Sequence, residues 1–208
     1  MEYSNQEALT LKKWIIFSSL GWIFGVVMVI LIALFLEGLR LGFSSQAVVG
    51  LGMGLGVGTL QWLILKRYLK INTKWIIASV GGFGFSYIMA DIILYVFELK
   101  PEIIMPIATG LGALISAWFQ EQLVLKKLVK PPYLWVPYSF TAWIIAHAIT
   151  MGLFYMSPKL IQGLPPYLSF TIAILFLMIE GPILGYISSF SILPVVNQTI
   201  QKIKHPFE

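Results

Sequence analysis

The sequence contains no cysteine, and only 11% of its 208 residues are charged. The lack of cysteine excludes disulfides, thiolate nucleophiles and cysteine-ligated metals or clusters. Soluble proteins carry about 25% charged residues, and a chain with less than half of that fraction cannot cover a water-soluble globule of this size. The composition therefore excludes a soluble enzyme, a nucleic-acid-binding domain and a disordered chain.

Long apolar runs are what the sequence has instead, since 58% of its residues are hydrophobic and its mean hydropathy is +0.86. A membrane-spanning helix needs roughly 20 apolar residues, and a helix satisfies its own backbone hydrogen bonds in lipid. Six runs qualify: 14–36, 45–65, 75–97, 103–125, 135–155 and 167–196, the last with Pro182 and Pro194 as expected kinks. The sequence predicts an all-α membrane protein, a single six-helix domain over 1–208 with no soluble domain.

The basic residues gather on one side of this topology. Eleven share the side that holds both termini: Lys12, Lys13, Lys66, Arg67, Lys70, Lys74, Lys126, Lys127, Lys130, Lys202 and Lys204. The other side holds only Arg40, Lys100 and Lys159. The positive-inside rule therefore predicts that both termini lie in the cytoplasm.

The chain also repeats itself. A shift of 61 residues places 13–16 on 74–77, and a shift of 60 places 50–52 on 110–112. Each unit is a helix that opens on tryptophan, followed by a Gly-rich return helix that closes on a basic pair, which the third unit lacks. Because two helices return the chain to the same side, the units are parallel, and parallel repeats are related by an axis along the membrane normal. We predict three units, about 14–70, 75–130 and 135–196, in a pseudo-three-fold bundle.

Glycines in these helices predict close packing. Gly50, Gly54 and Gly58 recur at four-residue spacing on one face of the second run, and Gly181 and Gly185 repeat that spacing in the sixth. Small residues let helices approach closely in lipid. Packing within the bundle is the first interpretation, and a homo-oligomer seam or a docking face for a membrane-protein partner is the alternative.

The second run ends in the segment Gln61-Trp62-Leu63-Ile64-Leu65-Lys66-Arg67. This pattern resembles bacterial integral membrane proteins that carry repeated Gly-rich Q-W-x-x-L-[KR] helix units. The similarity covers 50–79 and is degraded over 110–139, where Glu121-Gln122 replaces Gln61-Trp62. The resemblance supports the topology and implies no activity. We expect the protein in the bacterial cytoplasmic (inner) membrane or in an internal membrane.

Ionisable residues inside spans are costly and are therefore candidates for function. His147 lies near the middle of the fifth run and Glu180 near the middle of the sixth, at similar depth by a rise of about 1.5 Å per residue. We predict a contact between them that could relay protons or bind a polar or cationic ligand. The alternative is a structural hydrogen bond in the bundle core.

Other polar residues are secondary candidates. Asp91 lies in the outer part of the third run, one turn from Tyr87, and a shift of 60 places Tyr87 on His147. Asp91 could join the site, or could only cap a helix end. Glu121 and Gln122, which match Gln61 and Trp62, lie near the ends of return helices, where Glu121 could pair with Lys126 or snorkel to the interface.

These patterns favour a transport-type protein, a small carrier, channel or membrane substrate-binding subunit with a midplane polar site. The alternatives are a non-catalytic scaffold or regulatory subunit and, third, an intramembrane enzyme acting on a lipid. We name no catalytic residue, because the sequence has no Gly-x-Ser-x-Gly elbow and no paired-aspartate protease motif. No metal or other cofactor is expected, and no nucleic-acid partner. Membrane lipids are the expected partners of the basic loops.

Overall fold

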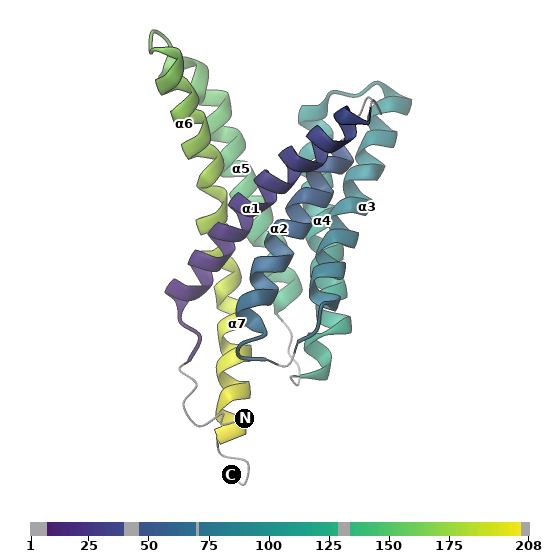
Figure 1. Cartoon of the computed structure of the whole chain (residues 1–208), viewed down its shortest axis with the longest axis vertical. Helices are drawn as coiled ribbons and strands as arrows, with labels where there is room; N and C mark the ends of the chain where they lie inside the picture. The colour runs from purple at the N-terminus through teal and green to yellow at the C-terminus, as the bar shows by residue number, and fades with distance from the viewer. Residues whose placement is uncertain (1–7, 40–45, 70, 129–133, 205–208) are drawn as a thin grey trace.

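The computed structural model describes residues 8–39, 46–69, 71–128 and 134–204, and these form helices without any strand (Figure 1). The helices are α1 (Leu11–Gly38), α2 (Gln46–Leu65), α3 (Lys74–Phe97), α4 (Pro101–Leu123), the short 3-10 helix η1 (Leu125–Lys127), α5 (Trp135–Ile161), α6 (Pro166–Met178) and α7 (Glu180–Lys204). Six segments are long and apolar enough to cross a membrane, with α6 and α7 together forming the sixth. The prediction of an all-helical chain with six potential spans is confirmed.

Helix α1 begins earlier than the apolar run does. The Thr10 side chain accepts a hydrogen bond from the backbone N–H of Lys13 at 3.3 Å, so Thr10 is the N-cap. A capping hydroxyl satisfies one of the donors that the first helical turn leaves free. The cap therefore sets the start of α1 at Leu11, three residues before Trp14.

The sixth span is broken, where the sequence predicted a kink. Helix α6 ends at Met178 and α7 begins at Glu180. Proline at 182 has no N–H to donate to the Met178 carbonyl, and its ring crowds that carbonyl, and the helix breaks at this turn. Pro194 lies inside α7 without a break. Glu180 thus lies near the middle of the sixth span, as predicted, and it is also the first residue of α7.

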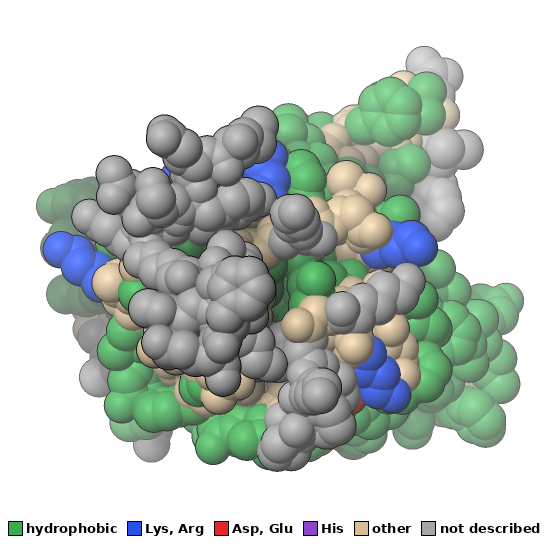
Figure 2. Space-filling model, turned by 90° about the horizontal axis from the view of Figure 1, so that it is seen from below, with side chains coloured by type: hydrophobic (Ala, Val, Ile, Leu, Met, Phe, Trp, Pro, Cys, Tyr) green, Lys and Arg blue, Asp and Glu red, His purple; other side chains and the backbone are tan. Residues whose placement is uncertain are grey.

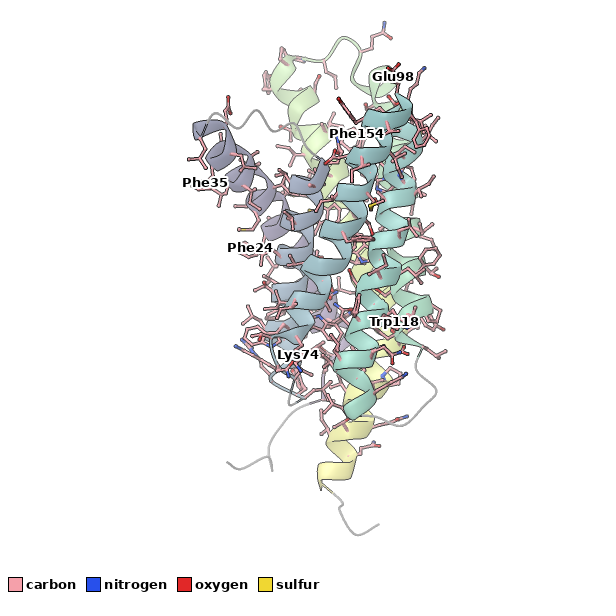
Figure 3. The ribbon with its side chains drawn as sticks, turned by 90° about the vertical axis from the view of Figure 1, so that its right-hand side faces the viewer. Phe24, Phe35, Lys74, Glu98, Trp118 and Phe154 are labelled. Atoms are coloured by element: carbon pink, nitrogen blue, oxygen red, sulfur yellow. The ribbon has the colours of Figure 1, made fainter. Side chains whose placement is uncertain are left out.

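The helices pack in a closed ring. Each of α1 to α5 contacts the next, α5 contacts α7, and α7 contacts α1. The α5–α6 hairpin rises beyond the ring and leans away from α2, α3 and α4, while α1 crosses the front of the bundle (Figure 1). On the flanks, apolar side chains such as Phe24, Phe35 and Trp118 point outward (Figure 3). An apolar outer surface of this kind suits lipid and not water.

Helix α2 lies between α1 and α3, and glycines form both of its interfaces. A Cβ added to Gly50, Gly54 or Gly58 would overlap residues of α3, whereas a Cβ on Gly56 would overlap Gly25 of α1. A Cβ on Gly181 or Gly185 of α7 would likewise overlap α1. These faces are covered by helices of the same chain, so the alternative that they form a seam with another protein is wrong.

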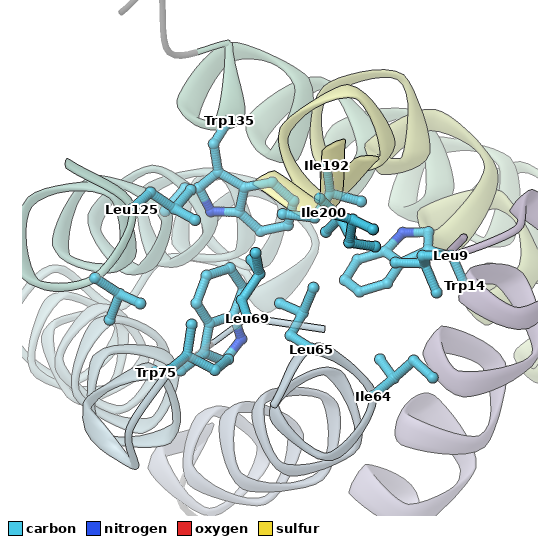
Figure 4. Close-up of a cluster of buried hydrophobic side chains, with 14 residues drawn as sticks. Leu9, Trp14, Ile64, Leu65, Leu69, Trp75, Leu125, Trp135, Ile192 and Ile200 are labelled. Atoms are coloured by element: carbon cyan, nitrogen blue, oxygen red, sulfur yellow. The ribbon is translucent and has the colours of Figure 1, made fainter. Parts of the chain in front are cut away.

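A cluster of three tryptophans closes one end of the bundle (Figure 4). The Trp135 ring lies 6.4 Å from that of Trp14 and 5.2 Å from that of Trp75, centroid to centroid. Leu9, before α1, and Ile200, near the end of α7, pack in the same cluster. We call this the tryptophan end. Seen from below in Figure 2, it shows Lys and Arg side chains around its margin.

Candidate functional site

A cavity of about 320 Å³ lies inside the ring, beyond the tryptophan cluster. Its walls come from α1 to α7 and are mostly apolar, with a second group of aromatic residues at its base. Trp22 and Trp143 lie 5.6 Å apart, and Phe83 lies 4.4 Å from Trp143, centroid to centroid. Trp22 is eight residues beyond Trp14 on α1, roughly 12 Å along a helix that rises 1.5 Å per residue.

Five polar residues interrupt the apolar wall: Tyr87, Thr109, His147, Thr150 and Glu180. His147 on α5 and Glu180 at the start of α7 face each other, with 3.8 Å between His147 Nδ1 and Glu180 Oε1. The contact predicted from the sequence is therefore present. The separation is too long for a hydrogen bond, so neither atom satisfies the other.

Four polar atoms around the cavity make no hydrogen bond within the described part of the chain. They are Trp22 Nε1, His147 Nε2, Thr150 Oγ1 and Glu180 Oε1, of which the Thr150 hydroxyl lies near enough to Glu180 to interact with its carboxyl group. All four residues line the cavity, and the side chain of Glu180 is only 3% exposed. Leaving a buried donor or acceptor unpaired costs about 1–3 kcal/mol, and more for a charged group. The cavity therefore has strong, unmet hydrogen-bonding capacity from α1, α5 and α7 in one place.

Tyr87 and Thr109 satisfy each other. The Tyr87 hydroxyl lies 2.8 Å from Thr109 Oγ1, and both residues are buried. This bond links α3 to α4 across one wall of the cavity. Tyr87 thus lies in the same cavity as His147, and its hydroxyl already has a partner in the chain.

Asp91 has a structural role. Its two carboxylate oxygens accept hydrogen bonds at 2.9 Å from the backbone N–H groups of Gln46 and Ala47, in the first turn of α2. A carboxylate here caps the N-terminus of α2 and interacts favourably with the helix dipole. Of the two predictions made for Asp91, the cap is observed, on α2, and the residue lies outside the described cavity lining.

The remaining predicted residues lie toward the tryptophan end. Gln61 is buried in α2. Lys126 donates to Gln122 and also interacts electrostatically with Glu121, which is one of the two roles expected of Glu121. Glu121 is 9% exposed, and its Oε2 makes no hydrogen bond in the described chain. Gln61, Glu121 and Gln122 do not line the cavity. The structure therefore does not bring them together with His147 and Glu180.

Sequence reasoning missed several residues. Gln120 accepts from Trp135 Nε1 at 2.7 Å and donates to Ser79 Oγ at 2.8 Å, which ties α4 to both α3 and α5. Trp22 and Thr150 of the cavity were also missed. The signal for Trp22 is its place inside a span, because an indole N–H that faces neither interface needs a partner.

Among the described residues, no group of three His, Asp or Glu side chains is placed to hold a metal ion. No protein-family model, curated protein or solved structure matches the chain. What the protein does must therefore be argued from the cavity itself.

Proposed function

We propose that the chain is a transport-type integral membrane protein that binds its ligand in the central cavity, beside Glu180 and His147. The observation that carries this proposal is the convergence of four unpaired polar atoms in an otherwise apolar cavity. Unpaired buried polar atoms also occur in the packed core, among them Ser18 Oγ and Trp75 Nε1, but in the described chain these four are the ones whose residues line the cavity. A ligand with a polar group would satisfy them and would fill the apolar space around them.

The shape of the bundle supports a transport role. Buried aromatic side chains fill the tryptophan end, whereas at the other end the α5–α6 hairpin leans away from α2, α3 and α4. A cavity that is sealed toward one end is the arrangement expected of one conformation of a carrier. Alternating access then requires a second conformation, in which the tryptophan end opens.

We further propose that the three units are true repeats around a pseudo-three-fold axis. In support, residues related by shifts of 61 and 60 meet in layers along the bundle. Trp14, Trp75 and Trp135 form the first layer. Trp22, Phe83 and Trp143 form the second, and Val26, Tyr87 and His147 all line the cavity.

Glycine contacts support the same proposal for the third return helix. A Cβ on Gly58 would meet Ser79 and the backbone of Ile76, and a Cβ on Gly185 would meet Ser18 and the backbone of Ile15. Ser79 and Ile76 are the 61-shift equivalents of Ser18 and Ile15. The matching alignment of α7 on α2 places Glu180 on Met53, another cavity residue. In this alignment, the third unit has the acidic residue Glu180 at the position where the first unit has the apolar residue Met53.

We propose that the tryptophan end is cytoplasmic, because Lys12, Lys66, Lys74 and Lys126 lie beside it, whereas Lys100 begins the opposite end of α4. A bacterial cytoplasmic or internal membrane suits the Q-W-x-x-L-[KR] units, and we propose a relationship to the membrane proteins that carry them.

Cysteine labelling tests the transport proposal directly, because the chain has no cysteine of its own. Met151→Cys places a thiol in the cavity wall, and Met156→Cys, 59% exposed on the same helix, is the matched control. A membrane-impermeant methanethiosulfonate reagent is applied to vesicles of each orientation. We expect Met151→Cys to react from both sides at different rates. Reaction from neither side would overturn the proposal and would favour the scaffold alternative.

A further inference from the structure

We propose that the ligand of this cavity is a lipophilic organic cation, with a monovalent ammonium-type group beside Glu180 and an aromatic or alkyl body against the apolar wall. This inference rests on the proposed function and adds the chemical class of the ligand. Three features of the cavity lead to it: its single acidic residue, the aromatic rings that line it, and the scarcity of other oxygen ligands.

The first feature is charge. Glu180 is the only acidic residue among the described cavity lining, which contains no lysine or arginine. The other titratable residues that face the cavity are His147 from α5 and Tyr87 from α3. An isolated carboxyl group in an apolar space keeps its proton, because its ionised form is costly there unless a positive charge accompanies it. A cation in the cavity would stabilise the ionised form of Glu180, whereas an anion would oppose it.

The second feature is the set of aromatic rings that line the cavity together with Glu180. At the base of the cavity the Trp143 ring contacts those of Trp22 and Phe83, and Gly181, the residue after Glu180, lies against Trp22. The face of an aromatic ring attracts a cation, most strongly for tryptophan, and aromatic cages recognise quaternary ammonium groups. The cation–π pairs in the described part of the chain, Lys66 with Trp62 and Arg67 with Phe17, involve other rings.

The third feature argues against a hard divalent cation. Hard divalent cations take about six to eight oxygen ligands. The cavity offers one carboxyl, the Thr109 and Thr150 hydroxyls and the Tyr87 hydroxyl, and the rest of its side chains are almost entirely apolar. Such a wall cannot replace a hydration shell, but it can bury the body of an organic molecule, and about 320 Å³ suits a drug-sized one.

Benzyltrimethylammonium and neopentylbenzene test this inference as a matched pair, because they have nearly the same shape and differ by one positive charge. Binding of labelled benzyltrimethylammonium to the full-length protein in detergent is measured by equilibrium dialysis, with neopentylbenzene as competitor. We expect the cation to bind, the neutral isostere to compete at least about tenfold more weakly, and Glu180→Gln to lose at least about tenfold in affinity. Glu102→Gln, an exposed glutamate at the start of α4, is the control and should bind as the unmodified protein does.

The outcomes separate this inference from the proposed function. If neopentylbenzene competes as well as the cation itself, the cavity takes a neutral ligand, and the inference is overturned while the proposed function stands. The isostere comparison needs no variant, so it decides the question even if Glu180→Gln does not fold. If the cation does not bind at all, the inference is again overturned, and labelling of Met151→Cys decides the proposed function independently.

Discussion

The backbones of α1 and α2 touch at Gly25 and Gly56. A Cβ added to Gly56 would overlap the backbone N and Cα of Gly25, and it would also approach the Gly21 carbonyl to 2.8 Å. Backbone atoms cannot turn aside as a flexible side chain can, so a larger residue would force the two helices apart. Because lipid provides no hydrophobic drive for helix association, close packing of this kind carries much of the stability. On its other face, α2 packs through Gly54 against the backbone of Ser79.

We therefore predict that Gly56→Ala lowers the free energy of unfolding by about 1–3 kcal/mol, the usual cost of overpacking a core. Gly81→Ala is the matched control, because a Cβ there meets nothing within 4 Å. Alanine is the better helix former, so that variant should be as stable as the unmodified protein or slightly more stable. Thermal unfolding in mild detergent checks both, and equal midpoints for the two variants would contradict the assigned α1–α2 contact.

Asp91 allows a second prediction. As a helix cap it should affect stability, whereas as part of the ligand site it should affect ligand affinity. Asp91→Ala removes both acceptors of the Gln46 and Ala47 N–H groups and should destabilise the protein by about 0.5–2 kcal/mol. Asp91→Asn retains one side-chain oxygen and should cost less. Benzyltrimethylammonium affinity should change little in either variant. A large loss of affinity in Asp91→Asn with unchanged stability would instead place Asp91 in the ligand pathway.

The sequence predicted the spans well because lipid imposes a simple requirement, about 20 apolar residues in helical form. The meeting of His147 and Glu180 followed from helix rise alone, which fixes depth. Tertiary partners could not be foreseen in the same way. The cap formed by Asp91 depends on N–H groups 44 and 45 residues away, and hydropathy gives no sign of it.

The cavity was harder to predict than the contact between His147 and Glu180 within it. Trp22 and Trp143 are counted among the hydrophobic residues, so the composition does not separate them from residues that only fill the core. Their role depends on which neighbours they meet, since the Trp22 indole N–H is unpaired only because no acceptor lies opposite it in the described chain. Likewise, proline at 182 predicted a disturbed helix, but whether a helix kinks or breaks there depends on its packing.

Pro182→Ala tests whether the break before Glu180 positions the carboxyl. An N–H at 182 could donate to the Met178 carbonyl, so that α6 and α7 would join and Glu180 would turn away from His147. We expect unchanged or higher stability together with a loss of about tenfold in benzyltrimethylammonium affinity, or about 1.4 kcal/mol. Pro194→Ala, at a proline that α7 accommodates without a break, is the control. Unchanged affinity in Pro182→Ala would show that the break does not shape the site.

Labelling the two ends of α3 tests the orientation of the bundle in the membrane. Lys74 and Glu98 are both exposed and lie at opposite ends of this helix (Figure 3). Its 24 residues extend about 36 Å at 1.5 Å per residue, enough to cross the hydrocarbon core of a bilayer. In the cysteine-free chain, an impermeant maleimide should label Glu98→Cys on intact cells and Lys74→Cys only after permeabilisation. The reverse pattern would place the tryptophan end outside the cell. Labelling of both from one side would mean that α3 does not cross the membrane, because a spanning helix must separate its two ends.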